Sequence, residues 1–161
     1  MNFSDKILAW EELPAWRIKM RSSGKTLVVT NGCFDVLHRG HITYLSEARR
    51  LGHCLLVGLN SDTSTRELKG SGRPVNPETD RAFVLAALAC VDAVCIFSDR
   101  TAVRFLAEAQ PDVYVKGGDY TLETLNCEER KTVERSGGMI TILPLVAGRS
   151  TTLMLERIAR L

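Results

Sequence analysis

The amino-acid sequence predicts an α/β fold, in which a parallel sheet is covered by helices on both faces. Apolar runs of strand length alternate along the chain with stretches of helical periodicity. This alternation is typical of parallel strands joined by right-handed crossovers. Polar and glycine residues follow most of the apolar runs, which is where ligands bind in open α/β sheets. We therefore expect residues 1–161 to form a single domain, with 1–23 as an N-terminal helical extension and 24–161 as the core.

The N-terminal extension is expected to be helical from residue 4 to residue 22. Ser4 can cap one short helix, Pro14 suits the first turn of a second, and Gly24 suits its end. Four apolar side chains of this extension should pack onto the main body: Leu8, Trp10, Leu13 and Trp16. No functional role is expected there.

The core is expected to contain five strands and five helices. The strands correspond to the apolar runs Thr26–Thr30, Cys54–Leu59, Ala93–Phe97, Val113–Val115 and Met139–Leu143. The helical patterns cover about 41–51, 78–90, 100–109, 123–136 and 150–160. In the last of these, the spacing of Met154, Ile158 and Leu161 predicts a stripe that faces the core. The stretch from Asn60 to Pro77 is predicted to be a long irregular loop, and such loops are usually functional or mobile.

The composition excludes several classes of protein. The chain has 161 residues, 45% of them hydrophobic and 25% charged, as in ordinary globular proteins. A net charge of +2 is too small to indicate nucleic-acid binding. The five cysteines form no Cys-x-x-Cys pair, which favours a reducing compartment over a disulfide scaffold. The longest apolar run, Ala82–Val91, is too short to span a bilayer. We therefore expect a cytoplasmic protein that binds neither nucleic acid nor membrane.

The segment from Thr30 to His41 is the strongest functional signal. It leads from a strand through a glycine-bearing turn into a helix, whose N-terminus offers free N–H groups and partial positive charge to a phosphate. His38 and His41 lie on either side of Gly40, and two imidazole donors there would stabilise charge that develops during a reaction. A metal site that includes Cys33 is the alternative, although no pattern for a fourth ligand follows.

Other residues of this segment have less specific roles. Asp35 could have a functional role, in which it orients a histidine or binds a substrate group. Alternatively, it is a turn aspartate whose side chain forms a hydrogen bond to its own backbone. Asn31 and Gly32 most simply form the turn, and Gly32 also allows a ligand to approach closely.

Three further clusters are expected beside this segment at the carboxyl edge of the sheet. The run from Lys116 to Asp119 places a cation, two glycines and an acceptor at a strand end, and lysine suits phosphate as a point charge. The segment 150–152 supplies hydroxyl groups at a helix start, which form a second anion site or an N-cap. Three cations near the long loop can bind phosphate or are solvated surface charges: Lys69, Arg73 and Arg81.

Two common nucleotide-binding motifs are absent. The run Gly24-Lys25-Thr26 is not a phosphate-binding loop, because it precedes its strand and Lys19 occupies the position of the first glycine. No Gly-x-Gly-x-x-Gly follows the first core strand, and no serine occupies a nucleophile elbow. These absences argue against an ordinary kinase, dehydrogenase or serine hydrolase.

The run from Asn31 to His41 contains His-x-Gly-His and so resembles the cytidylyltransferase-like nucleotidyltransferases. Further stretches resemble one branch, the D-glycero-β-D-manno-heptose 1-phosphate adenylyltransferases of bacterial ADP-heptose synthesis. These stretches are Val57–Ser64, Leu68–Pro77, Asp80-Arg81, Val113–Tyr120 and Ser150–Thr152. The similarity covers nearly all of residues 24–161.

The resemblance implies a Rossmann-like nucleotidyltransferase with a five-stranded sheet in the order 3-2-1-4-5. It implies ATP and heptose 1-phosphate as substrates, and ADP-heptose and pyrophosphate as products, for lipopolysaccharide core precursors. Mg²⁺ is the implied cofactor, held through the nucleotide phosphates and not by protein side chains. A homo-oligomer, either a dimer or a tetramer, is also implied.

The residues of three sites follow from the motifs together with the resemblance. The catalytic residues are expected to be His38, His41, Lys69 and Arg81. The ATP-binding residues are expected to be Asn31, Gly32, Cys33, Phe34, His38, Gly40, His41, Lys116, Gly118, Asp119, Ser150, Thr151 and Thr152. The residues that bind the sugar phosphate are expected to be Asp35, Asn60, Asp62 and Arg73.

The sequence departs from the family pattern in three places. Bifunctional relatives carry an N-terminal sugar kinase that this sequence does not contain, so a separate kinase is expected to supply the phosphate. The run Leu145–Arg149 replaces the Arg-Thr-Glu-Gly-Ile of glycerol-phosphate enzymes, which argues against that branch and leaves the role of Arg149 open. Residues 125–129 match the heptose branch weakly.

Two other functions remain as alternatives. One is a cytidylyltransferase that acts on a glycerol or amino-alcohol phosphate with CTP. The other is a nucleotide-binding sensor without turnover, although such a sensor would not need the two histidines as transition-state donors.

Overall fold

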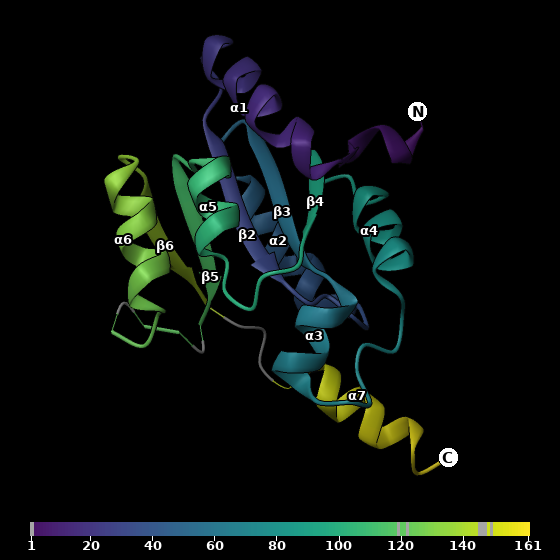
Figure 1. Cartoon of the computed structure of the whole chain (residues 1–161). Helices are drawn as coiled ribbons and strands as arrows, with labels where there is room; N and C mark the ends of the chain where they lie inside the picture. Colours follow the sequence, from purple (N-terminus) through teal and green to yellow (C-terminus); the bar gives the residue numbers. More distant parts are fainter. Residues whose placement is uncertain (1, 119, 122, 145–147, 149) are drawn as a thin grey trace.

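A parallel sheet with six strands forms the centre of the protein, as Figure 1 shows. The computed structural model describes residues 2–118, 120–121, 123–144, 148 and 150–161. The strand order is β1-β4-β3-β2-β5-β6, and every neighbouring pair is parallel. The strands are β1 (Ile7–Leu8), β2 (Leu27–Gly32), β3 (Cys54–Asn60), β4 (Ala93–Phe97), β5 (Val113–Gly117) and β6 (Met139–Leu143).

The prediction of five strands in the order 3-2-1-4-5 is wrong in the number of strands. The five predicted strands follow one another as β4-β3-β2-β5-β6, and β1 adds a sixth strand at the edge beside β4. The two residues of β1 lie within the N-terminal extension, which was expected to be helical. A strand of two residues is too short to show an alternating hydrophobic pattern in the sequence. It forms because the edge of β4 offers free backbone N–H and C=O groups.

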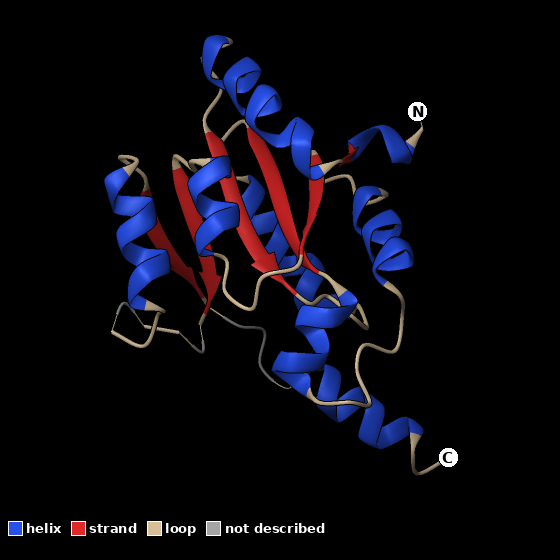
Figure 2. Ribbon diagram, viewed as in Figure 1, coloured by secondary structure: helices blue, strands red, loops and turns tan. Residues whose placement is uncertain are grey.

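The helices cover both faces of the sheet, as Figure 2 shows. On one face, Leu13, Phe105 and Val133 pack against side chains of alternate strand positions such as Val29 and Tyr114. The α-helices are α1 (Leu13–Ser22), α2 (Arg39–Arg49), α3 (Asp62–Lys69), α4 (Glu78–Ala86), α5 (Val103–Ala109), α6 (Cys127–Arg135) and α7 (Thr151–Ile158). Two short 3₁₀ helices, η1 (Phe3–Lys6) and η2 (Trp10–Glu12), precede α1.

The opposite face is covered by α2 and α4. Leu45 and Leu85 pack there against Val28, Leu55 and Val57. Because side chains alternate along a strand, adjacent residues such as Val28 and Val29 lie in different cores. The N-terminal extension joins the first of these cores, since Leu8, Trp10, Leu13 and Trp16 all pack there as predicted.

The prediction of an irregular loop from Asn60 to Pro77 is wrong over its first half. Residues Asp62–Lys69 form α3, in which the Ser61 hydroxyl accepts a hydrogen bond from the Ser64 N–H at 3.2 Å. Gly70 ends the helix with φ +96°, a conformation that favours glycine. Ser, Thr and Asp are weak formers of helix interiors, so the segment gave no strong helical signal.

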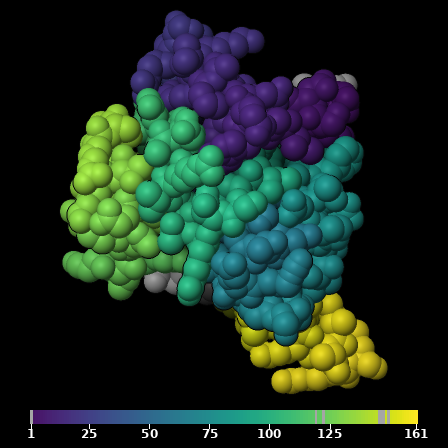
Figure 3. Space-filling view, viewed as in Figure 1, coloured from purple at the N-terminus to yellow at the C-terminus, as the bar shows by residue number. Residues whose placement is uncertain are grey.

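The predicted core-facing stripe of the last helix is also wrong. Helix α7 contains no buried residue, and Ile158 and Leu161 are exposed. Figure 3 shows the yellow C-terminal segment standing out from the body of the molecule. The periodicity is therefore that of an amphipathic helix whose apolar side does not reach the sheet. Within the described residues, no helix combines the length and apolar character that crossing a membrane requires.

Candidate active site

A cleft of about 790 Å³ lies at the carboxyl ends of β2, β3 and β5. The cleft brings together most of the predicted site residues although they are up to 121 positions apart in the chain. These are Asn31, Gly32, Cys33, Phe34, Asp35, His38, Gly40, His41, Asn60, Lys69, Arg73, Lys116, Ser150, Thr151 and Thr152. The N-termini of α2 and α7 both belong to this lining, so their unpaired N–H groups add positive potential.

The two histidines are fixed at the start of α2 by backbone hydrogen bonds. His38 is the N-cap, and its Nδ1 accepts from the Gly40 N–H at 3.1 Å. The Nδ1 of His41 accepts from the His38 N–H at 3.4 Å. The rings stack with centroids 4.0 Å apart, and Phe34 packs edge-on against His41. The local sequence therefore holds both imidazoles in one orientation.

These contacts determine which ring nitrogen can donate. A neutral imidazole has one N–H, so a ring whose Nδ1 accepts carries its hydrogen on Nε2. Burial, with the charge of His38 as a smaller cause, lowers the pKa of His41 to about 4. His41 is therefore neutral at physiological pH, and it offers an Nε2–H donor without a positive charge.

The turn between β2 and α2 holds Phe34 in an unusual conformation. Phe34 has φ +43°, in the left-handed region that non-glycine residues seldom adopt. Such backbone conformations cost energy and collect at functional sites. Here the conformation buries the ring of Phe34 between the cleft and a neighbouring cavity.

The cleft is lined by several cations. Lys116 is buried, and its Nζ donates to the Asn31 Oδ1 at 3.1 Å and lies 4.8 Å from the Tyr120 ring centroid. Arg73 binds Asp35 through its Nε at 2.6 Å, and its Nη groups make no hydrogen bond to any described residue. Lys69 is exposed at the end of α3 and faces the same space. These three cations suit a ligand with several phosphates.

Asp35 anchors the loop that follows α3. Its carboxylate accepts from the Arg73 Nε and from the N–H groups of Val75 and Asn76, at 2.6–2.9 Å. Burial acts to raise the pKa of Asp35, but these backbone and arginine donors outweigh it, so the pKa lies below its ordinary value. The side chain is 1% exposed, so the structure favours anchoring of the loop over direct contact with substrate.

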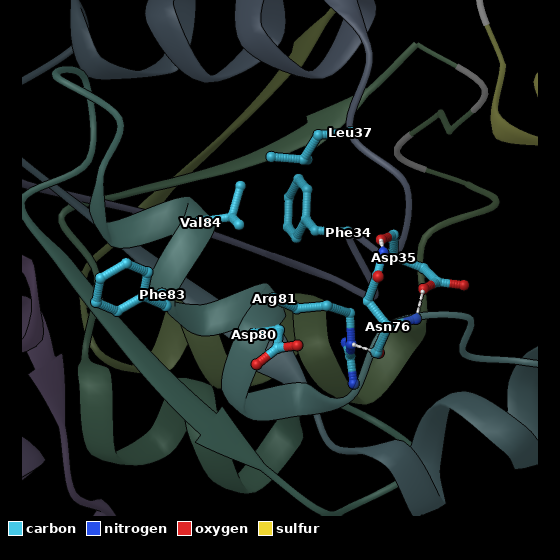
Figure 4. Close-up of a pocket in the computed structure, with 8 residues that line it drawn as sticks. All are labelled: Phe34, Asp35, Leu37, Asn76, Asp80, Arg81, Phe83 and Val84. Atoms are coloured by element: carbon cyan, nitrogen blue, oxygen red, sulfur yellow. Dashed lines mark hydrogen bonds between the residues drawn. The ribbon is translucent and has the colours of Figure 1, made fainter.

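Arg81 does not reach the main cleft. Figure 4 shows it in a neighbouring cavity of about 360 Å³, beside Asn76 and Asp80. Its guanidinium donates to the carbonyl oxygens of Cys33, Asn60 and Asn76 and to the Asp62 Oδ1, at 2.6–2.9 Å. A side chain that is 1% exposed and bound on all sides cannot also bind phosphate. These contacts favour a positioning role for Arg81 over the predicted catalytic contact.

Helix α7 contributes hydroxyl groups to the cleft. The Ser150 Oγ accepts from the Leu153 N–H at 3.1 Å and so caps the helix. The Thr151 Oγ1 donates to the Val36 carbonyl at 3.3 Å and ties α7 to the turn before His38. Thr152 is exposed in the lining. Ser150 thus combines the predicted N-cap with a place in the lining of the cleft.

Two other predicted residues that the structure describes, Asp62 and Gly118, are not part of this lining. Asp62 pairs with Arg81 through its Oδ1 at 2.7 Å, which favours a role in holding Arg81. Gly118 is exposed beside the end of β5 and does not line the cleft. Asp119 and Arg149 lie outside the described residues.

Several residues that line the cleft or support it were not predicted from the sequence. Tyr44 bridges the Thr30 hydroxyl and the Val115 carbonyl, at 2.7 and 2.9 Å. Glu129 is buried in α6 and binds the Tyr114 hydroxyl at 3.0 Å. The stretch after β4 contributes Arg100 and Thr101. Only this last pair had a signal in the sequence, since it follows a predicted strand end.

The described residues contain no group of three or more histidine, cysteine or acidic side chains that could hold a metal ion. Cys33, His38 and His41 all belong to the described part of the chain, and both Nδ1 atoms already accept backbone hydrogen bonds. The alternative of a metal centre at these residues therefore has no ligand set.

Residues 29–150 match the family described as cytidylyltransferase-like. The chain belongs to this family. The matched region begins in β2 and ends at Ser150, so it contains the turn, both histidines and Lys116. The residues that form the candidate site therefore lie largely within the region that matches the family, residues 29–150.

Relatives within this family include long proteins named bifunctional protein HldE. The chain is 48% identical over 158 residues to that of Syntrophotalea carbinolica and 51% identical over 141 residues to that of Streptomyces coelicolor. These matches cover 98% and 88% of this chain. The chain spans about a third of the length of these relatives, at 32% and 30%.

Two solved structures are also similar. The lipopolysaccharide core biosynthesis protein from Thermoplasma volcanium has a TM-score of 0.63 and 27% identity, over 76% of this chain and 98% of that one. A pantoate-beta-alanine ligase from Francisella tularensis, solved with an ATP compound and β-alanine, has a TM-score of 0.60. The match covers 96% of this chain and 78% of the ligase, and at 12% identity it supports the fold alone.

Proposed function

We propose that this chain transfers AMP from ATP to D-glycero-β-D-manno-heptose 1-phosphate and releases pyrophosphate. The observation that carries the proposal is the pair of imidazoles at the start of α2, whose Nδ1 atoms accept backbone hydrogen bonds. Their Nε2–H groups then serve as donors in a cleft lined by Lys69, Arg73 and Lys116. The choice of heptose phosphate is supported by the resemblance of residues 57–77 and 113–120 to the heptose branch and by the HldE relatives.

In the proposed reaction, an oxygen of the sugar 1-phosphate attacks the α-phosphorus of ATP. A new O–P bond forms as the bond from the α-phosphorus to the bridging oxygen breaks, and the electron pair leaves with pyrophosphate. The protein supplies positioning and charge stabilisation instead of a covalent nucleophile. His38 and His41 would donate to the oxygens of the α-phosphate, and the cations would bind the sugar phosphate and the leaving group.

In this proposal, a divalent metal ion would bind to the nucleotide and not to protein side chains. The described residues offer Mg²⁺ no cluster of ligands, and the cleft presents mainly N–H groups and cations. Mg²⁺ would therefore be held by the phosphates of ATP, where it supplies charge neutralisation.

The remaining parts of the site would divide between the two substrates. Asn31, Lys116 and the N-terminus of α7 would face the nucleotide, and Asp119 stays part of this proposal as a nucleotide contact. Asn60 and Arg73 would face the sugar phosphate. Arg81, Asp35 and Asp62 would hold the loop 70–77 in place. We also propose that residues 1–161 form one domain. The protein would assemble into a homo-oligomer of such chains.

The experiment is a pyrophosphate-release assay on the purified chain. ATP with heptose 1-phosphate should give turnover, whereas CTP with glycerol or amino-alcohol phosphates should give little. Reversed preferences would establish the cytidylyltransferase alternative. Nucleotide binding without pyrophosphate from any acceptor would establish the sensor alternative. Light scattering on the same sample determines the number of subunits.

A further inference from the structure

Four polar side chains line the cleft where α5 and α6 meet, and the proposed reaction gives them no role. They are Arg100 and Thr101, which follow β4, and Asn126 and Glu129, which lie at the N-cap and in the first turn of α6. The two helices pack side by side on one face of the sheet, as Figure 1 shows. We call these four residues the α5–α6 patch.

Hydrogen bonds fix the position of the patch. Glu129 is 6% exposed, and its two oxygens accept from the Ala102 N–H at 2.9 Å and from the Tyr114 hydroxyl at 3.0 Å. The Asn126 Oδ1 accepts from the N–H groups of Glu128 and Glu129 at 2.9 and 3.1 Å and so caps α6. The buried carboxylate therefore ties the start of α5 to the start of α6.

The members of the patch keep hydrogen-bonding capacity that the protein does not use. The Asn126 Nδ2 group, the Thr101 hydroxyl and the Arg100 guanidinium make no hydrogen bond to any residue that the structure describes. Each oxygen of Glu129 has two lone pairs and accepts one hydrogen bond from a described residue. The patch thus presents donors and acceptors side by side to the cleft.

This combination fits the hydroxyl groups of a sugar better than a phosphate or a base. A hydroxyl group both donates and accepts, so it can donate to Glu129 while it accepts from Asn126 or Thr101. The oxygens of a phosphate are acceptors, as are those of Glu129, so the two would face each other without a hydrogen. An adenine ring needs a flat surface for stacking, whereas all four side chains of the patch are polar.

We infer that the α5–α6 patch is a subsite for adjacent hydroxyl groups of a substrate sugar. Thr101 and Asn126 donate to hydroxyl oxygens, Glu129 accepts a hydroxyl hydrogen, and Arg100 adds a donor at the exposed rim. Both substrates of the proposed reaction carry such groups, on the ribose of ATP and on the heptose ring. The inference rests on the proposed function, since it takes the occupants of the cleft from that reaction.

Two conservative variants remove single groups from the patch. Asn126→Asp keeps the oxygen that caps α6 but replaces the Nδ2 donor by an acceptor. Thr101→Val keeps the shape of the side chain and removes its hydroxyl group. Ser98→Ala is the matched control, because it removes an exposed hydroxyl from the same loop at a residue that does not line the cleft. Glu129 is left unchanged, since its replacement would also release the start of α5.

Ligand affinities measured by calorimetry distinguish the two sugars. If the ribose occupies the patch, Thr101→Val should weaken ATP binding roughly 3- to 10-fold, the effect of about one hydrogen bond, and should leave the affinity for 2′,3′-dideoxy-ATP unchanged. If the heptose occupies it, the same loss should appear in the affinity for heptose 1-phosphate, measured beside a non-hydrolysable ATP analogue. Asn126→Asp should weaken the same ligand at least as much, because its oxygens supply no hydrogen.

Two results would overturn the inference. One is unchanged affinity for both ligands in folded Asn126→Asp and Thr101→Val proteins, with folding checked by circular dichroism. The other is an equal loss of affinity for ATP and for 2′,3′-dideoxy-ATP, because the patch would then contact the base or the phosphates. Ser98→Ala should bind every ligand like the wild type.

Failure of the proposed function would be distinguishable from failure of this inference, because the affinities need no turnover. A wild type that releases pyrophosphate with heptose 1-phosphate, while both variants bind both ligands normally, would disprove only the subsite. A wild type that forms no ADP-heptose, while the variants lose affinity for ATP but not for its dideoxy analogue, would disprove only the proposed acceptor.

Discussion

Replacement of Arg81 tests whether this residue holds the site together or touches substrate. Its guanidinium joins the turn after β2, the end of β3, the loop before α4 and Asp62 of α3. Arg81→Met keeps much of the side-chain length and removes every one of these donors. Three carbonyl oxygens and one carboxylate then lose their partner.

The expected loss of stability follows from burial. Breaking a buried ion pair by removing one partner costs about 3–5 kcal/mol. The Asp62 side chain is 28% exposed and regains some water, so we expect the lower end for the ion pair. Asn60 is buried, so loss of the hydrogen bond from Arg81 to its carbonyl oxygen should cost a further 1 kcal/mol or more, on the order of one buried hydrogen bond. We therefore expect Arg81→Met to lower the free energy of unfolding by about 4 kcal/mol, a large share of the roughly 5–15 kcal/mol of a typical domain.

The assay is urea unfolding followed by circular dichroism, together with ATP affinity. Arg81→Lys keeps the charge but lacks the planar fork, so it should lose about half as much stability and remain folded for kinetics. Arg66→Met, an exposed arginine of α3, is the matched control and should change stability by less than about 0.5 kcal/mol. If Arg81→Met unfolds at the wild-type urea concentration and loses only kcat, Arg81 acts on substrate and the structural reasoning is wrong.

Three further variants test the cleft. His41→Ala should keep the fold and lose about 10²–10³ in kcat, the usual cost of one transition-state donor, and near-full activity would contradict its role. Asp35→Asn should speed hydrogen exchange in residues 73–76, because it weakens the contact to Arg73, while exchange in β3 stays unchanged. Lys69→Met should raise the KM for the sugar phosphate without loss of stability, since Lys69 is exposed, and an unchanged KM would remove it from the site.

The position of the cleft could be predicted because it depends only on strand topology. Parallel strands bring their carboxyl ends to one edge, so residues as distant as Asn31, Lys116 and Ser150 had to meet once the strands were recognised. A helix after the glycine turn was also visible, because the turn and the helical pattern are local features, although α2 begins at Arg39 and not near residue 41 as predicted. No contact between distant side chains was needed for either prediction.

The roles of Arg81 and Asp35 could not be predicted, because both depend on how the loop 70–77 folds back. A sequence shows that these side chains are charged, but not that Asp35 meets the backbone of Val75 and Asn76. Glu129 was hidden for a related reason. It occupies the first turn of a polar helix, where an acidic residue ordinarily complements the helix dipole at the surface, and only the packing of α6 against α5 buries it.

Because the folded protein holds His41 neutral, its free energy of unfolding should depend on pH. The folded pKa of about 4 lies below the ordinary value of 6.5, because burial and the neighbouring His38 oppose the charged form. Above pH 6.5 the ring is neutral in both the folded and the unfolded chain. Between pH 6.5 and about 4 the unfolded chain binds a proton that the folded chain does not, so His41 destabilises the fold progressively as the pH falls through this window.

Unfolding free energies of the wild type and His41→Ala, measured from pH 4.5 to 7.5, isolate this effect. The wild type should lose more stability than the variant as the pH falls. Parallel curves for wild type and His41→Ala would show that the ring is not held neutral. Because a neutral Nε2–H stays a donor on both sides of pH 6.5, the same property would let His41 donate to a phosphate of the proposed substrate across the physiological range without itself titrating.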